Sequence, residues 1–250
     1  MATSNNQINK IIACGDSVTH GYYLENSYYD DNHVVKCNKS YPELVAEELG
    51  AILTHLAKPG ASNYCIAKQL DHAFTLKPDF IIIGLTTSHR FDYTIDMFPE
   101  KYWKDNIPRI VDFAYSNHGK STETNEKGVI DSQPFSTIER RPELREFADY
   151  ILKYVDEDIK RDQDRHIVMG MLWKLAKTKI PYVMIDWTNL VLYDYKSPSV
   201  IKELNWEEFR DKYPSDGVHF NQEGHEVAAR RINSFIKNMK AIHSITAKKQ

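Results

Sequence analysis

The sequence has few cysteines and lacks a long hydrophobic run. Its three cysteines, Cys14, Cys37 and Cys65, are odd in number and show no Cys-x-x-Cys spacing, so they predict neither a disulfide framework nor a zinc knuckle. No run approaches the roughly 18 apolar residues of a membrane span. Residues 1–10 are polar and lack the apolar core of a signal peptide. We therefore expect no membrane association and a reducing, cytoplasmic location.

Charge of one sign is not in excess either. The 250 residues include 32 basic and 35 acidic side chains, which gives a formal net charge of −3. Nucleic-acid binders usually carry a clear basic excess or stripe, so no nucleic-acid partner is predicted and any ligand must be recognised locally. With 42% hydrophobic residues the chain can bury a core, and no repeat or linker divides it. A single domain over residues 1–250 is expected.

Four short apolar runs alternate with longer amphipathic stretches. Short apolar runs closed by turn residues are typical of strands covered on both faces, as in a parallel sheet. Helices are predicted from a serine cap at Ser40, with Glu43 three residues later, from Pro142 and from Gln222. The pattern predicts an α/β fold with a mainly parallel sheet. The four runs are residues 11–14, 51–57, 80–83 and 182–185.

Residues 118–141 interrupt this alternation. They are rich in Ser, Thr, Glu, Asn and Gly and have no apolar period. We expect a long loop inserted at the rim of the sheet. Loops of this length in compact domains are often functional lids or disordered segments, and both interpretations stay open here.

The residues that follow each predicted strand are the ones that can carry chemistry. In a parallel α/β sheet, ligands bind outside the carboxyl ends of the strands. A glycine follows each of the first three strands, and backbone N–H groups at a helix start can bind an oxyanion. The three groups are Gly15-Asp16-Ser17, then Gly60 with Ala61-Ser62-Asn63, and Gly84 with Thr86 and Thr87.

Asp216 and His219, directly before the last predicted helix, complete a candidate catalytic trio with Ser17. A serine is a weak nucleophile until a base takes its proton, and the imidazole needs a third group to fix its tautomer. One short turn can present Asp216 and His219 on the same side. A histidine suits the task because its ordinary pKa of about 6.5 lets it accept and return a proton near neutrality. Each motif alone is common in turns and helix caps. It is their order along the chain, with the serine after the first strand and Asp216 and His219 before the last helix, that favours catalysis.

These blocks resemble those of the SGNH hydrolases, also called the GDSL esterase and lipase family. Gly15-Asp16-Ser17 matches the first block, with Val18 where leucine is common. Gly60 is similar to the second-block glycine, and residues 216–219 are similar to the last block. The stretch 57–64 is also similar to SGNH-type proteins of large tailed bacteriophages, which implies a virion or host-glycan role as an alternative.

The family resemblance implies a three-layer α/β/α sandwich with a flavodoxin-like sheet. It further implies that Ser17 is the nucleophile, His219 the base and Asp216 its partner. The oxyanion hole would come from the N–H groups of Ser17 and Gly60. The expected reaction is ester hydrolysis by acyl transfer, on short acetyl-type esters of a small molecule or carbohydrate. A low-activity binding or structural module is the alternative.

The third block departs from the family pattern. The family usually has Gly-x-Asn-Asp, whose asparagine donates to the oxyanion, whereas Gly84-Leu85 is followed here by Thr86. Losing one such donor costs on the order of 10²–10³ in rate. A hydroxyl from Thr86 or Thr87, or the amide of Asn63, is expected to replace it.

Other residues near these blocks are candidates for substrate binding. His89 and Arg90 follow the third strand and can hold a substrate anion, although a rim residue that is solvated or paired structurally is the plainer interpretation. Tyr22 and Trp187 can stack on a sugar or cover an acyl chain, with ordinary packing as the alternative. The predicted substrate-binding residues are Asp16, Thr87, His89 and Trp187.

Cofactor motifs fail on inspection. The His-Glu-x-x-His zinc motif begins at His225 but has Ala229 in place of the second ligand. Gly119-Lys120-Ser121 is similar to the end of a P-loop, yet Ala114 stands in the place of its first glycine. No metal, nucleotide or dinucleotide cofactor is predicted, and the oligomeric state is left open.

Overall fold

The computed structural model describes residues 7–22, 24, 28–29, 34–35, 39–88, 90, 154, 156–188, 191–192, 195, 197–201, 204–214 and 219–247. The loop predicted at 118–141 and the first part of the helix predicted from Pro142 lie outside these residues.

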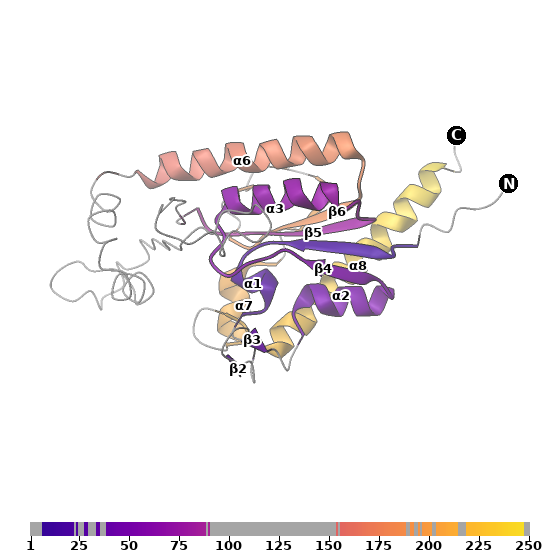
Figure 1. Ribbon diagram of the computed structural model, residues 1–250, viewed down its shortest axis with the longest axis horizontal. Helices are drawn as coiled ribbons and strands as arrows, with labels where there is room; N and C mark the ends of the chain where they lie inside the picture. The colour runs from indigo at the N-terminus through magenta and orange to yellow at the C-terminus, as the bar shows by residue number, and fades with distance from the viewer. Residues whose placement is uncertain are drawn as a thin grey trace.

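The main sheet has five parallel strands, as the apolar runs predicted (Figure 1). Its spatial order is β4-β1-β5-β6-β7, which in order along the chain is 2-1-3-4-5, the flavodoxin-like arrangement. The predicted α/β fold class is therefore confirmed. The strands are β1 (Lys10–Cys14), β4 (Ile52–His55), β5 (Phe80–Leu85), β6 (Tyr182–Asp186) and β7 (Val200–Ile201).

Helices cover both faces of this sheet and make three layers (Figure 1). Alternate strand residues point to opposite faces, so Ile82 packs with one helix layer and Ile81 with the other. The first layer contains α2 (Tyr41–Leu49), α7 (Trp206–Lys212) and α8 (Gln222–Ala247); the second contains α3 (Asn63–Thr75) and α6 (Glu157–Thr178).

The helix predicted from Ser40 to Leu49 is confirmed as α2. The Ser40 N–H donates to Glu43 Oε2 at 2.6 Å, which is one half of a capping box. The helix ends at Gly50, whose φ of 63° is left-handed. Local sequence signals thus set both ends of this helix.

Several short elements were not predicted. They are too short to show a hydrophobic periodicity in the sequence, since β7 has two residues and α7 has seven. The others are α1 (Ser17–His20) and the antiparallel pair β2 (Tyr28–Tyr29) and β3 (Val34–Val35).

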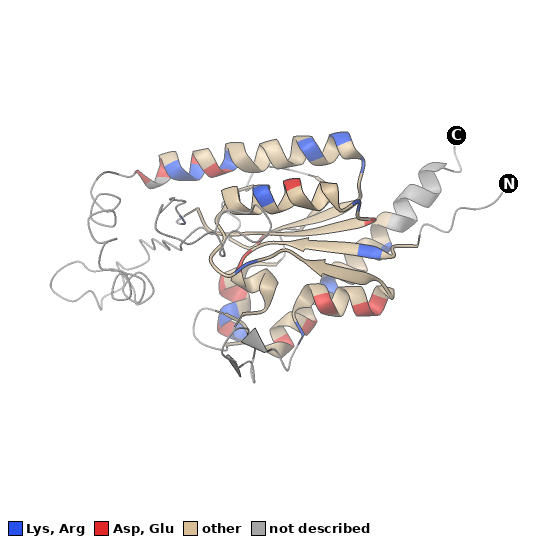
Figure 2. Ribbon diagram, viewed as in Figure 1, with Lys and Arg blue, Asp and Glu red and all other residues tan. Residues whose placement is uncertain are grey.

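Charged residues lie mainly on the helices, and α6 carries both signs (Figure 2). Within the described part of the chain, no helix is long and apolar enough to cross a membrane.

Candidate active site

Ser17 is the first residue of α1, and Gly15 and Asp16 separate it from the end of β1. It is 6% exposed. Asp16 caps the helix, because its Oδ1 accepts the Val18 N–H at 3.0 Å. In a 2-1-3-4-5 sheet the strand order reverses between β1 and β5, and ligands bind at this switch point. Ser17 therefore lies where this fold places its ligands.

The corner between β1 and α1 is packed around the side chain of Thr19. A Cβ on Gly15 would lie 2.1 Å from Thr19 Oγ1, and a Cβ on Gly84 would lie 2.2 Å from the same atom. The Thr19 hydroxyl is 2.9 Å from the hydroxyl of Tyr41. Burial raises the pKa of Tyr41, so this phenol stays protonated. The two glycines let α1 close tightly against the end of β5.

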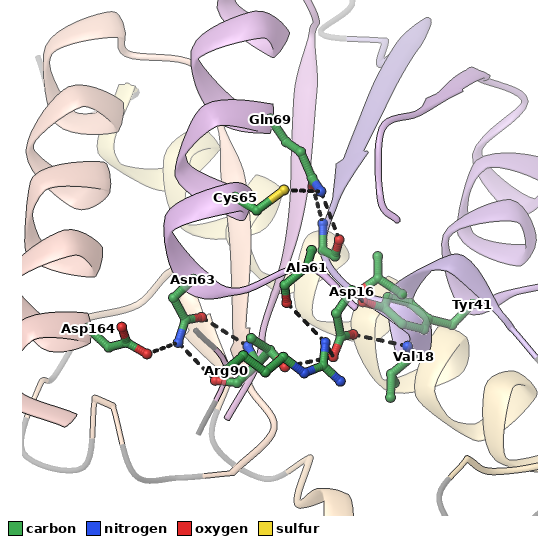
Figure 3. Close-up of polar contacts among 12 residues, drawn as sticks. Asp16, Val18, Tyr41, Ala61, Asn63, Cys65, Gln69, Arg90 and Asp164 are labelled. Carbon is green, nitrogen blue, oxygen red and sulfur yellow. Dashed lines mark hydrogen bonds and ion pairs between the residues drawn. The ribbon is translucent and has the colours of Figure 1, made fainter. Parts of the chain in front are cut away.

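Gln69 of α3 holds the backbone at Gly15. Its Oε1 accepts the Gly15 N–H at 2.7 Å, and its Nε2 donates to the Gly15 carbonyl at 3.1 Å (Figure 3). Gln69 is fully buried, and one carboxamide thus satisfies both backbone groups of the residue two positions before Ser17.

The second block is a tight turn over residues 58–61. The Ala61 N–H donates to the Lys58 carbonyl at 3.2 Å, and Gly60 has a φ of 83°. Pro59 followed by a residue with positive φ is the signature of a type II turn. The Lys58 N–H donates to the Gly15 carbonyl at 3.1 Å, so this turn is joined to the loop that carries Ser17.

Asn63, at the start of α3, holds the loop after β5 in the same way. Its Oδ1 accepts the Thr86 N–H at 3.0 Å, and its Nδ2 donates to the Thr86 carbonyl at 3.0 Å and to Asp164 Oδ2 at 2.9 Å. Lys160 pairs with the other oxygen of Asp164. Burial raises the pKa of Asp164, and Lys160 and Asn63 only partly oppose that shift.

The Asp16 carboxylate is engaged inside the protein. Besides Val18, it accepts the Thr86 hydroxyl on Oδ2 at 2.8 Å and lies 3.1 Å from Arg90 Nη1. It is buried. This corrects the expectation that Asp16 binds substrate, because its oxygens already serve three internal donors.

The expected replacements for the third-block asparagine are also engaged. Both amide hydrogens of Asn63 are donated to Thr86 and Asp164, and the Thr86 hydroxyl is donated to Asp16. Neither side chain, in this arrangement, has a hydrogen left for an oxyanion. Thr87 is half-buried beside them, and its role stays a prediction.

His219 lies directly before α8 and is 4% exposed. Its ring meets the ring of Tyr22 edge-on, with centroids 6.0 Å apart. Tyr22 is tied to the turn that carries Ser17, since its N–H donates to the Ser17 carbonyl at 3.0 Å. The two ends of the predicted trio are thus joined through Tyr22. Asp216 and His89 lie outside the described residues, and their roles stay predictions.

Trp187 packs inside the core. It is 2% exposed, and its ring contacts Tyr41, Phe209 and Phe220 with centroids 5.6, 5.8 and 5.3 Å away. This corrects the expectation that Trp187 binds substrate, because a ring enclosed by other rings has no face for a sugar.

Sequence reasoning missed Gln69, and it allowed a structural pairing of Arg90 without identifying the partners. Gln69 had a detectable signal, since it falls on the helix face defined by Ile66, Leu70 and Ala73. A polar residue at a core-facing position needs an internal partner. Arg90 had no such signal, because its partners come from two other loops.

No family model matches the sequence, and no curated protein sequence matches it. The structure is similar to that of the lipase Lip_vut3 from a goat rumen metagenome. The TM-score is 0.51 at 14% identity, over 91% of this chain and 97% of that one. This chain shares the fold of that lipase. The psychrotrophic esterase EstA from Pseudoalteromonas sp. has a TM-score of 0.48 at 10% identity, over 93% of this chain and 99% of that one. A member of the lipolytic protein G-D-S-L family from Veillonella parvula has a TM-score of 0.44 at 13% identity, over 88% of this chain and 94% of that one. The likeness to the lipase establishes the fold alone, and activity is a separate question.

Proposed function

We propose that this protein is a serine-dependent ester hydrolase that acts by acyl transfer. Ser17 Oγ attacks the ester carbonyl while His219 takes its proton, and Asp216 holds the imidazole in the required tautomer. The N–H groups of Ser17 and Gly60 bind the oxyanion of the tetrahedral intermediate. His219 then returns the proton to the leaving alcohol, and water releases the acyl group from Ser17.

The observation that carries this proposal is the link between Ser17 and His219. Ser17 begins a helix at the switch point of the sheet, and Tyr22 from the same turn packs on the ring of His219. These residues are about 200 positions apart in the sequence, so only the fold can bring them to one place. A nucleophile and a base at the carboxyl edge of one sheet are what acyl transfer requires.

For the substrate, we propose short acyl esters such as acetyl groups, including those of carbohydrates. Tyr22 supports this choice because a half-buried ring next to the base can cover a small acyl group or stack on a sugar. Thr87 and His89 are the substrate contacts proposed from the loop after β5.

The test is hydrolysis of p-nitrophenyl acetate by the wild type and by Ser17→Ala, together with fluorophosphonate labelling and peptide mapping. We expect the variant to lose at least about 10³-fold in kcat and the label to map to Ser17. Ser234→Ala is the matched control, because Ser234 is exposed on α8 and bonds only within that helix. Equal rates for wild type and Ser17→Ala would remove the proposal.

A second candidate is a binding or structural module, glycan- or virion-associated, with little turnover. It is favoured by the third block, where the side chains of Asn63 and Thr86 are engaged internally and offer no third oxyanion donor. This candidate predicts glycan binding that survives Ser17→Ala. A glycan array that retains neither the wild type nor the variant would count against it.

A further inference from the structure

We propose that Arg90 is a positioning residue that holds the two proposed oxyanion donors, the N–H groups of Ser17 and Gly60, in a fixed relation to each other. This inference rests on the proposed function. It assigns the third block a different task from that of the family's asparagine. In place of a third donor to the oxyanion, the loop after β5 supplies a bridge between the other two blocks.

The bridge is visible in the contacts of one guanidinium nitrogen. Arg90 Nη1 forms an ion pair with Asp16 Oδ2 at 3.1 Å and donates a hydrogen bond to the Ala61 carbonyl at 3.0 Å (Figure 3). Asp16 directly precedes Ser17, and Ala61 directly follows Gly60. The guanidinium therefore joins the immediate neighbours of both proposed donors.

The bridge adds a second attachment between the turn over residues 58–61 and the first block, at the end of the turn. Lys58, the first residue of the turn, binds the Gly15 carbonyl through its N–H at 3.1 Å. Ala61, the last residue, reaches the first block through Arg90. Gly60 lies between these two attachment points, so the direction of its N–H depends on both.

Arginine is suited to this task because the two hydrogens of one Nη lie in the plane of the guanidinium, so a single nitrogen can face two acceptors at a fixed angle. The side chain of Arg90 is 13% exposed and that of Asp16 is 5% exposed, so the pair is largely shielded from water. Arg90 Nε is buried and has no hydrogen-bond partner among the described residues. A buried donor left unsatisfied costs about 1–3 kcal/mol, and a role in stability alone therefore explains this arginine poorly.

The consequence for the reaction is a dependence of rate on alignment. Oxyanion donors act only when they lie about 2.7–3.1 Å from the position that the oxyanion will occupy. A displacement of about 1 Å can cost on the order of 10²-fold in rate. Loss of the bridge should therefore lower kcat and leave KM almost unchanged, since no substrate contact is removed.

The test compares Arg90→Gln with the wild type and with Arg161→Gln as control. Arg161 pairs with Asp158 within helix α6. Crystal structures give the distance between the amide nitrogens of Ser17 and Gly60, and p-nitrophenyl acetate hydrolysis gives kcat and KM. For Arg90→Gln we expect that distance to change by about 0.5 Å or more and kcat to fall about 10²-fold, with KM within about threefold. Arg161→Gln should change neither.

An unchanged distance in Arg90→Gln overturns the proposal, and so does an unchanged kcat beside a changed distance. If the wild type hydrolyses no ester and carries no label at Ser17, the proposed function fails, while the distance still decides the structural role of Arg90. Should Arg90→Gln not fold, Arg90→Lys decides with the same measurements. It keeps the charge beside Asp16 but not the planar guanidinium, so it should shift the Gly60 amide and lower kcat to a smaller extent.

Discussion

Thr19 determines how closely α1 approaches the end of β5. Its side chain fills the space that a Cβ would need at both Gly15 and Gly84. The nearest atom to a Cβ on Gly84 is Thr19 Oγ1 at 2.2 Å, followed by the Tyr41 hydroxyl at 2.8 Å. To relieve contacts this short, the side chain of Thr19 must rotate or α1, which carries Ser17, must move.

Gly84→Ala should therefore destabilise the protein by about 1–3 kcal/mol, the usual cost of overpacking a core. The cost should be smaller in a Thr19→Ala background, because that change removes the atom that the new methyl group meets first. Urea unfolding of the four members of this double-mutant cycle measures the coupling.

Gly170→Ala is the control for this cycle. Gly170 lies in α6, and a Cβ there meets nothing within 4 Å. Since alanine favours a helix over glycine by about 1 kcal/mol, this variant should be slightly more stable than the wild type. Additive free energies for Gly84→Ala and Thr19→Ala would show that Thr19 is not the obstacle.

At the scale of elements, α3 holds the ends of two neighbouring strands with two carboxamides. Gln69 binds both backbone groups of Gly15 after β1, and Asn63 binds both backbone groups of Thr86 after β5. One rigid helix thus sets the relative position of the first and third blocks. Loss of the Gln69 carboxamide leaves the buried Gly15 N–H unsatisfied, while the Gly15 carbonyl keeps the Lys58 N–H; loss of the Asn63 carboxamide removes the partner of both Thr86 groups.

Gln69→Met tests this role. Methionine keeps the length and helix propensity of glutamine but has no strong donor or acceptor. We expect a loss of about 1–3 kcal/mol in the free energy of unfolding, because the buried Gly15 N–H is left unsatisfied while the Gly15 carbonyl keeps the Lys58 N–H. We also expect a lower kcat, because Ser17 follows Gly15 closely. Gln163→Met, at an exposed position of α6, should be near neutral in chemical denaturation. Equal midpoints for the two variants would contradict the role of Gln69.

The same elements show how far the sequence could predict the structure. Apolar runs predicted β1, β5 and β6, because burial on both faces leaves a continuous signal. An apolar run also predicted β4, although this edge strand is exposed or half-buried along its length. The capping residues of α2 predicted both of its ends. The polar contacts of the site were not predictable, because Asn63, Thr86 and Asp164 form one cluster from three distant segments. Trp187 shows the opposite error, since an aromatic residue after a strand gives no sign of whether it faces a pocket or the core.

At the scale of the whole molecule, the strand order explains why the site lies where it does. Because β1 and β5 are neighbours and their crossovers cover opposite faces, the loops after these strands diverge and leave room between them. Asp16, Thr86 and Arg90 close the base of that space with one hydrogen-bonded group. The α6 helix takes part from outside through Asp164, which ties it to Asn63 and hence to the third block.

This tie makes global stability depend on pH. The pKa of Asp164 is raised from the ordinary 3.8, first by burial, against the opposing effects of Lys160 and Asn63. Between pH 3.8 and the raised value the folded state binds more protons at this group than the unfolded state, so the contribution of Asp164 to stability falls as the pH rises through that window. Asp164→Asn removes the titration and keeps an oxygen that can accept from Asn63. We therefore expect the variant to gain stability relative to the wild type as the pH is raised from about 3.8 to 7.

Urea unfolding at several pH values measures this difference, with Asp162→Asn as the control. Asp162 is exposed on the same helix. The free energy of unfolding of its variant should therefore change with pH almost as that of the wild type does. The free energies of unfolding of Asp164→Asn and the wild type could instead change with pH in parallel, or the wild type could gain stability relative to the variant as the pH rises. Either result would show that burial is not the dominant effect on the pKa of Asp164. In that case the ion pair with Lys160 would be the larger effect, and the link between α6 and the third block would strengthen towards neutral pH.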